Sequence, residues 1–335
     1  MYRYLLTFLF STSIILAILF PLSVYFQPLS GDLTRIGGYA EVDFGWNKEP
    51  KIVEVMANTH LNDKIDVLIL GDSFSEKNIW QSKIARDLNF KSLSFAYKGD
   101  CIQSWIDFAL SQPVSTIVIE TAEKEFLNRF EELVVCSGNT FFPVRVMEGT
   151  TPNSRPQFEL KFYLKHTLMS VIHKIQIQLD PEVRLKGKTV SAPLLEQCAL
   201  FSNRKPNRLL YYPYDEAKLD WPNNSVVSAV ENVLHLQRQV TLHAKKFIFL
   251  VVPDKLSIYQ HCLKDFSQRN VYENINISEM LAEQGVNTLD LRDNLSQEVN
   301  SITDLYLPND THFSTDGYLR FAELIKPLFE LDLQR

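Results

Sequence analysis

Short apolar runs recur along the chain and alternate with segments of helical periodicity. The runs lie at residues 66–70, 92–95, 116–119, 247–252 and 286–289. Short, nearly continuous apolar runs are typical of strands buried on both faces, so we expect a parallel sheet. Helical patterns occupy residues 77–88, 102–110, 226–244 and 277–284, and a last helix is expected at about residues 315–329. This alternation predicts an α/β fold with a doubly wound parallel sheet, whose ligands bind beyond the carboxyl ends of the strands.

A long stretch separates the third and fourth predicted strands. It holds about 125 residues, far more than one crossover helix needs, so we expect an insertion at about residues 128–224. Residues 158–179 are apolar with interspersed lysines and histidines, which fits either a core helix or a helix at a membrane surface. Residues 203–221 form an aromatic, loop-rich stretch that either covers a cleft or packs on the surface. Its aromatic residues include Tyr211, Tyr212, Tyr214 and Trp221.

The N-terminus carries the longest apolar stretch. Residues 4–26 contain no charged residue, and a helix of this length crosses a hydrocarbon layer about 30 Å thick. No small-x-small cleavage site follows, which favours an uncleaved anchor over a signal peptide. We therefore expect a transmembrane anchor over residues 1–27, preceded on its cytoplasmic side by Arg3, with residues 28–335 outside the cytoplasm.

Composition narrows the function classes. The chain has 335 residues, 45% of them hydrophobic, and a formal net charge of −6, which is globular composition. A mildly acidic chain without a basic run lacks the electrostatic footprint of nucleic-acid binding, so no nucleic-acid partner is expected. The chain contains neither G-x-x-x-x-G-K-[ST] nor G-x-G-x-x-G, the two glycine-rich motifs that bind phosphate groups. The length fits two domains or one α/β domain with an insertion.

The number and spacing of the cysteines indicate the redox compartment, and the spacing of cysteines and histidines indicates whether a metal site is expected. Two disulfides in an oxidising compartment would use all four cysteines, and three pairings are possible. The four are Cys101, Cys136, Cys198 and Cys262. Their wide spacing excludes a CxxC motif, and the histidines show no metal-ligand spacing, so we predict no metal site.

A candidate nucleophile follows the first predicted strand. Residues 71–75 read Gly-Asp-Ser-Phe-Ser, which places Ser73 at the carboxyl end of a strand, after a glycine that permits a tight turn. The hydroxyl would lie at the rim of the sheet, near backbone N–H groups. Alternatively, Asp72 or Ser73 caps the helix at residues 77–88.

A candidate base lies near the end of the chain. A serine becomes a good nucleophile when an imidazole takes its proton, and the imidazole needs a partner that fixes its tautomer. His312 and Asp310 supply these two groups before the last helix. In the alternative interpretation, Asp310 or Ser314 caps that helix and His312 only packs.

Taken together, these motifs resemble a known family. Gly-Asp-Ser after the first strand, with an aspartate and a histidine before the last helix, resembles the SGNH (GDSL-like) hydrolase superfamily. The Asp-x-His spacing of residues 310–312 is similar to the alginate O-acetyltransferase group AlgJ/AlgX. Further similar segments lie at residues 33–38, 44–46, 119–121 and 252–255. The resemblance spans about residues 31–330.

The resemblance implies an SGNH-like fold and a covalent acetyl-serine. Ser73 would be the nucleophile, His312 the base and Asp310 the residue that orients it. The backbone N–H groups of Ser73 and Gly99 would form the oxyanion hole. The family's asparagine after the third strand is absent here, so a third donor is missing, supplied elsewhere or replaced by Thr121. We expect the nearby Glu120 or Glu123 to be structural and paired with an arginine.

The activity implied is O-acetylation of a polysaccharide by a single-pass protein of the inner membrane, with its catalytic domain in the periplasm. No bound cofactor is expected. Because acetyl-CoA is cytoplasmic, the acetyl group would be relayed by a membrane-bound O-acyltransferase partner. The alternatives are a carbohydrate acetyl esterase with the same triad, and a non-catalytic, membrane-anchored glycan-binding or assembly subunit. The polymer stays open between exopolysaccharide, capsule and another envelope glycan.

Two features are candidates for substrate contacts. Lys255 would contact substrate or donor, or else is an ordinary lysine at the start of a helix. The second feature is the aromatic set within residues 203–221, because aromatic faces stack on sugar rings. It consists of Tyr211, Tyr212, Tyr214 and Trp221.

Overall fold

The computed structural model describes residues 2–26, 31–37, 39, 41–48, 51–56, 64–97, 101–134, 189–264 and 275–330. The chain divides into two compact units, each assembled from segments that are distant in sequence. Unit 1 comprises residues 1–48, 155–213 and 307–311. Unit 2 comprises residues 49–154, 214–306 and 312–335.

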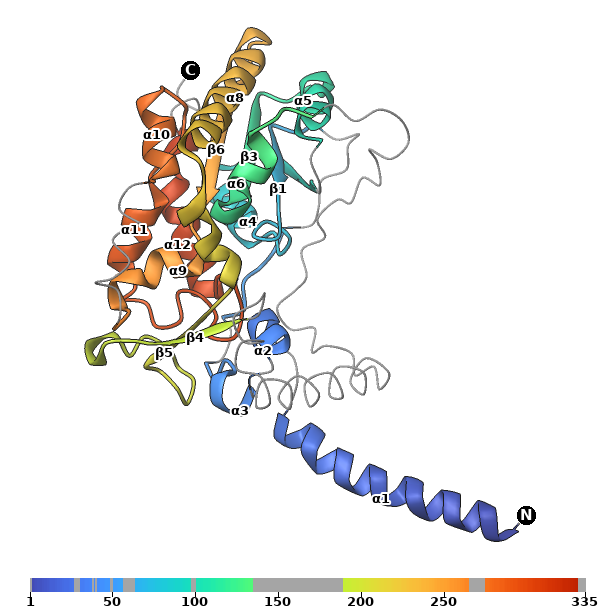
Figure 1. Cartoon of the computed structure of the whole chain (residues 1–335). Coiled ribbons are helices and arrows are strands. Elements are labelled where there is room, and N and C mark those ends of the chain that lie inside the picture. Colours follow the sequence, from blue (N-terminus) through green and yellow to red (C-terminus); the bar gives the residue numbers. More distant parts are fainter. Residues whose placement is uncertain are drawn as a thin grey trace. The chain divides into compact units, whose positions relative to one another are not determined.

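Unit 2 contains a parallel sheet with the strand order β2-β1-β3-β6 (Figure 1). The strands are β1 (Val67–Gly71), β2 (Ser92–Ala96), β3 (Thr116–Ala122) and β6 (Lys246–Val252). In register, Leu70 of β1 lies opposite Phe95 of β2 and Ile119 of β3. The chain moves outward from β1 to β2 and then returns to place β3 on the other side of β1. The carboxyl ends of β1 and β3 therefore form the topological switch point, where such sheets bind their ligands.

The fifth predicted strand, at residues 286–289, is not formed. This segment is linked to β6 by one backbone hydrogen bond, from Phe249 N–H to the Asn287 carbonyl at 3.0 Å. The Asn287 side chain donates to the Phe247 carbonyl, also at 3.0 Å. A side-chain amide thus binds a carbonyl of β6 where a fifth strand would supply a backbone N–H. The sequence prediction of a strand here is wrong.

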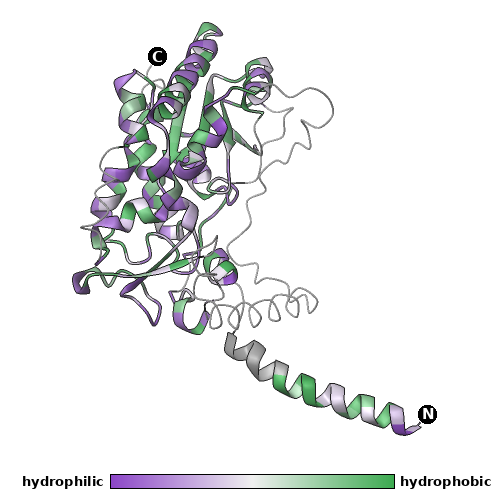
Figure 2. Cartoon of the chain, viewed as in Figure 1, coloured by the Kyte–Doolittle hydropathy of each residue, from purple (hydrophilic) through white to green (hydrophobic). Residues whose placement is uncertain are grey.

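Helices cover both faces of the sheet in unit 2. Helices α5 (Ile102–Ser111), α6 (Phe126–Phe130), α8 (Asn223–Leu242) and α10 (Ile277–Glu283) share one hydrophobic cluster with the apolar strand residues. Helices α4 (Ile79–Leu88) and α12 (Thr315–Ile325) pack against each other through Trp80 and Phe321, whose ring centroids are 5.6 Å apart, on the other face (Figure 1). The strands are the most uniformly hydrophobic elements of this unit (Figure 2). The predicted doubly wound parallel sheet is confirmed.

The last predicted helix is divided in two. Helix α12 ends at Ile325 and α13 (Pro327–Glu330) follows. Proline has no N–H to donate and disfavours helical backbone in the residue before it, so Pro327 interrupts the run. The remaining short elements of unit 2 are η1 (Glu123–Glu125), η4 (Pro213–Asp220), α9 (Lys255–Tyr259), η5 (Gln260–Cys262) and α11 (Leu291–Glu298).

Unit 1 contains a second, smaller sheet. Strand β4 (Val190–Pro193) pairs antiparallel with β5 (Arg208–Tyr211), inside the predicted insertion. Leu210 of β5 packs with Leu33 of α2 (Asp32–Gly37) and Phe44 of α3 (Glu41–Phe44). The other elements of the unit are η3 (Glu196–Cys198) and the N-terminal helix α1 (Tyr2–Phe26). The apolar residues 158–179 lie outside the described residues.

The predicted membrane anchor is not confirmed. Among the residues that the structure describes, no helix is both long enough and apolar enough to cross a membrane.

Disulfide formation agrees with the even cysteine count. Cys101, Cys198 and Cys262 are each disulfide-bonded, and the part of the chain that the structure describes has no free cysteine. Cys136 lies outside the described residues.

Candidate active site

Ser73 lies on an exposed turn directly after β1, at the carboxyl edge of the sheet in unit 2. Its neighbours Asp72 and Phe74 are buried, so Ser73 is presented to solvent on a well-anchored loop. Gly71 is required for this turn. A Cβ at that position would lie 2.2 Å from the Ser75 Oγ, closer than any carbon tolerates.

The capping alternative for this motif does not hold. The N-cap of α4 is Asn78, and no side chain caps this helix end. Asp72 instead accepts a hydrogen bond at 3.0 Å from the backbone N–H of Phe74. The Gly-Asp-Ser turn is therefore a structure of its own rather than the start of a helix.

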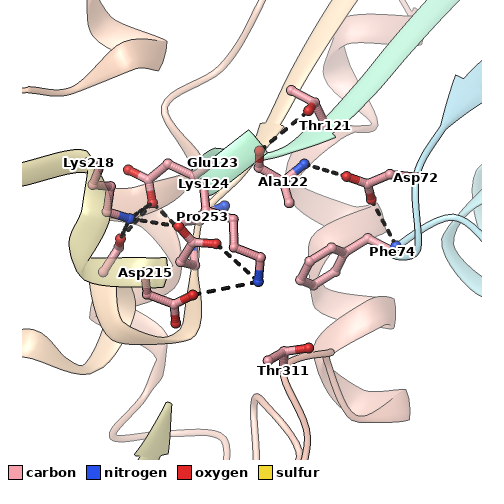
Figure 3. Close-up of polar contacts among 12 residues, drawn as sticks. Asp72, Phe74, Thr121, Ala122, Glu123, Lys124, Asp215, Lys218, Pro253 and Thr311 are labelled. Carbon is pink, nitrogen blue, oxygen red and sulfur yellow. Dashed lines mark hydrogen bonds and ion pairs between the residues drawn. The ribbon is translucent and has the colours of Figure 1, made fainter. Parts of the chain in front are cut away.

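Asp72 links the turn after β1 to the end of β3. Its Oδ2 atom accepts a hydrogen bond from the Ala122 N–H at 2.7 Å (Figure 3). The same atom accepts a hydrogen bond from Arg129 Nη1 at 2.9 Å. Burial raises the pKa of the Asp72 carboxyl, but the Arg129 charge and the backbone donors outweigh burial and bring the pKa below its usual value. Asp72 stays ionised and fixes the loop that carries Ser73.

The contacts of Arg129 also bear on whether Thr121 replaces the missing third oxyanion donor. Its Nη1 atom donates to the Thr121 hydroxyl at 2.8 Å and to the Tyr97 hydroxyl at 3.2 Å. Thr121 is fully buried, and its own proton goes to the Ala122 carbonyl at 3.4 Å. The Thr121 hydroxyl is therefore engaged inside the protein and does not face solvent beside Ser73.

Glu120 is a structural residue of this loop, as the sequence predicts for one of the glutamates after the third strand. Its Oε2 atom accepts hydrogen bonds from the Ser75 hydroxyl at 2.6 Å and from the Asp72 N–H at 3.1 Å. Burial and the neighbouring Asp72 carboxylate raise the pKa of Glu120 well above its usual value. Burial and the Asp72 charge thus favour the protonated, neutral form of Glu120.

His312 lies beside the turn that carries Ser73, within unit 2. Its imidazole packs on the ring of Phe74, the residue after Ser73, with ring centroids 5.0 Å apart. Phe74 also contacts Phe313, at 5.3 Å between centroids. The terminal helix is capped by Ser314, which accepts the Gly317 N–H at 3.2 Å. The structure therefore places His312 against the Ser73 loop and assigns the capping role to Ser314.

Asp310 belongs to unit 1, within residues 307–311. It is half-buried, and its Oδ2 atom accepts a hydrogen bond from the backbone N–H of Asp32 at 3.3 Å. Two trans peptide units join Asp310 to His312, so their Cα atoms cannot be more than about 7 Å apart. Gly99, the second predicted oxyanion donor, lies outside the described residues.

The predicted substrate contacts differ widely in exposure. Lys255 begins α9 and is only 1% exposed. Tyr211 is also 1% exposed, and Tyr212 and Trp221 are half-buried against hydrophobic clusters of unit 1 and unit 2, respectively. Tyr214 is 57% exposed. Of the four aromatic residues, Tyr214 is the most exposed.

A buried charge cluster that was not predicted from the sequence lies after β3 and β6 (Figure 3). Lys218 Nζ donates to Glu123 at 2.7 Å, to Asp254 at 2.8 Å and to the Ser257 hydroxyl at 2.5 Å. The predicted pairing of a glutamate with an arginine is confirmed for Glu123, whose Oε1 atom lies 2.6 Å from Arg292 Nη2. The available signal was the position of two acids at strand ends: Glu123 directly follows β3, and Asp254 is the second residue after β6.

A second lysine extends this cluster. Lys124 Nζ lies 3.6 Å from Asp215 and 3.9 Å from Asp254, both of which are buried. Burial raises the pKa of Asp254 to about 7, against the opposing charge of Lys218. Burial would also raise the pKa of Glu123, but Lys218 and Arg292 hold it well below its usual value.

Comparison with known proteins supports the predicted family. Residues 214–326 match the family model of the SGNH hydrolase-like domain of acetyltransferase AlgX. The match spans about a third of the chain and includes Asp310 and His312, but not Ser73. It confirms the resemblance to the AlgX-like SGNH group over these residues and supports an acyl-transferring enzyme in general. No curated protein and no solved structure matches the chain.

Proposed function

We propose that this protein is an O-acetyltransferase that moves acetyl groups through Ser73 onto hydroxyls of a polysaccharide outside the cytoplasm. One observation carries the proposal: the exposed Ser73 lies on a fixed loop at the switch point, and the His312 imidazole packs on Phe74, the next residue of that loop. The family match at residues 214–326 supports acyl transfer as the chemistry. It also favours a polysaccharide as the acceptor.

In the first half-reaction, His312 accepts the Ser73 hydroxyl proton while the Ser73 oxygen attacks the acetyl carbonyl of the donor. The tetrahedral intermediate carries its negative charge on the former carbonyl oxygen, facing the Ser73 and Gly99 N–H groups. Its collapse breaks the bond to the donor, whose leaving group takes the proton back from His312. Acetyl-Ser73 remains.

The second half-reaction reverses these steps with a sugar hydroxyl. His312 accepts the proton of that hydroxyl, the sugar oxygen attacks acetyl-Ser73, and the serine leaves with the proton from His312. Asp310 keeps the imidazole in the required tautomer and stabilises its protonated form. The products are an O-acetylated sugar and the free serine.

The cellular setting is part of the proposal. Residues 1–27 would anchor the protein in the inner membrane, with the catalytic part in the periplasm. The disulfides at Cys101, Cys198 and Cys262 favour an oxidising compartment. Acetyl-CoA is cytoplasmic, so a membrane-bound O-acyltransferase would relay the acetyl group, and the enzyme would hold no cofactor of its own.

The exposure of Ser73 favours one alternative, a carbohydrate acetyl esterase with the same residues. Water that reaches acetyl-Ser73 before a sugar does would release acetate. The two functions share the first half-reaction and differ only in what attacks the acyl-enzyme.

The test is mass spectrometry of the intact protein after incubation with a chromogenic acetyl ester, with and without oligosaccharides. We expect an adduct of about 42 Da on the wild type and none on Ser73→Ala. A Ser301→Ala variant, which changes an exposed serine elsewhere in unit 2, serves as the matched control. Transfer of the acetyl group to sugar supports the transferase, and acetate release that sugars do not alter supports the esterase. Wild-type activity in Ser73→Ala would refute both.

A further inference from the structure

Within unit 1, the segment that carries Asp310 is bound to the start of α2. The Asn309 carbonyl accepts hydrogen bonds from the N–H groups of Leu33 at 3.0 Å and Thr34 at 3.3 Å. The Asn309 side chain donates to Glu41 at 2.8 Å. Residues 309–311 thus pair with a segment that lies at the other end of the sequence.

Asp32 makes the most direct contact with this segment. Its Oδ1 atom accepts the Thr311 N–H at 2.9 Å, and its Oδ2 atom accepts the Thr311 hydroxyl at 2.6 Å. The Asp32 N–H donates in turn to the Asp310 carboxylate at 3.3 Å. One residue therefore binds both Asp310 and the residue between Asp310 and His312. These bonds to a carboxylate are charge-assisted and consequently strong.

Gly31 shows how closely the two segments approach. A Cβ at this position would lie 2.0 Å from the Asn309 carbonyl oxygen, so any other residue would push the segments apart. Glu41 also accepts the Gly31 N–H at 3.3 Å. Gly31 before Asp32 and Leu33 after it both contact Asn309, so the two segments are joined by several adjacent contacts rather than by one.

We propose that Asp32 is a positioning residue that sets the orientation of the Asp310 and His312 side chains. The proposal rests on the proposed function, because it assigns a task to Asp32 only if Asp310 and His312 take part in acyl transfer. Fixing the N–H and the hydroxyl of Thr311 fixes the backbone on both sides of it, and hence the directions in which its two neighbours point. A misplacement of about 1 Å in such a group lowers a rate by about 100-fold.

The test measures kcat and KM of the full chain with a chromogenic acetyl ester. Asp32→Ala should lower kcat by about 10- to 100-fold and leave KM within about twofold. Asp32→Asn should recover most of the rate, because its amide oxygen still accepts the Thr311 N–H and its amide N–H₂ can donate to the hydroxyl. Asp43→Ala should match the wild type, since Asp43 also lies in the first turn of a short helix of unit 1.

A double substitution separates positioning from a general loss of structure. Adding Asp32→Ala to His312→Ala should lower kcat no further, because without the imidazole there is no base left for Asp32 to orient, either directly or through Asp310. If the two losses multiply instead, Asp32 acts elsewhere and the proposal is overturned. Thr311→Val and Thr311→Ser provide a second pair in case Asp32→Ala does not fold. Serine should keep the rate and valine should lower it, and equal rates would overturn the proposal.

Failure of the inference is distinguishable from failure of the proposed function. If Asp310→Asn and Ser73→Ala lose activity while Asp32→Ala keeps it, only the role of Asp32 is refuted. If Asp310→Asn and Ser73→Ala both keep wild-type rates, the proposed function is refuted and the inference falls with it.

Discussion

Replacing Lys218 with methionine tests whether the buried charge cluster holds unit 2 together. Lys218 is 4% exposed and binds Glu123 and Asp254 directly. The cluster has three acids and three bases, so above about pH 7, where Asp254 is ionised, the substitution leaves one uncompensated charge. Its acids are Glu123, Asp215 and Asp254, and its bases are Lys124, Lys218 and Arg292.

The expected loss is large. Removing one partner of a buried ion pair costs about 3–5 kcal/mol, because the remaining charge is left without compensation. For a unit of this size, that corresponds to a decrease in melting temperature of roughly 10 °C. Urea unfolding followed by tryptophan fluorescence measures the free energy directly. The control is Lys264→Met, which removes an exposed lysine and should change the free energy of unfolding by less than about 0.5 kcal/mol.

The loss should also depend on pH. The pKa of Asp254 is about 7 in the folded protein, above its unfolded value, so the folded state binds the proton more tightly. The stability contributed by that proton is therefore lost as the pH rises toward and through 7. Without the opposing charge of Lys218 the pKa of Asp254 rises further, so the difference between variant and wild type should grow from pH 5.5 to pH 8.5. A loss no greater than that of Lys264→Met, or one independent of pH, would refute this reasoning.

Three further substitutions test the loop that carries Ser73 and the helix after His312. Arg129→Met leaves the buried Asp72 carboxylate without its counter-charge and should destabilise the protein by about 3–5 kcal/mol in urea unfolding, while Arg86→Met, an exposed control, should not. Glu120→Gln should cost less than about 1 kcal/mol at pH 7, because burial and the neighbouring Asp72 charge favour a neutral side chain at this position; a loss of several kcal/mol would contradict that reasoning. Ser314→Ala should lower the free energy of unfolding by about 1 kcal/mol through the lost helix cap, and an unchanged melting curve would contradict the role of that cap.

The features that could be predicted from the sequence are those with a local pattern. Four of the strands were predictable because burial on both faces leaves a continuous apolar run. The exposed turn at Ser73 was predictable because it follows such a run and begins at Gly71. The run at residues 286–289 was misleading, because its apolar pattern does not show that Asn287 uses its side chain to bind the neighbouring strand.

Contacts between residues distant in sequence left no such pattern. Lys218 and Glu123 are 95 positions apart, and Asp32 and Thr311 are 279 positions apart. A single lysine or aspartate in these places is indistinguishable from an ordinary surface charge until the fold buries it. The pairing of Glu123 with an arginine was predictable in kind, because a buried carboxylate needs a cation, but nothing local identified Arg292.

The acids near Ser73 pose an electrostatic problem that the structure resolves in two ways. Asp72 and Glu120 lie around the turn that would hold a negatively charged intermediate, and two carboxylates there would oppose it. Arg129 neutralises Asp72 through a direct ion pair at 2.9 Å. At Glu120 a bound proton is favoured instead, since burial and Asp72 raise its pKa well above the usual value. In the proposed function, the loop can therefore use carboxyl groups as hydrogen-bond acceptors that fix its shape and still offer N–H groups to an oxyanion.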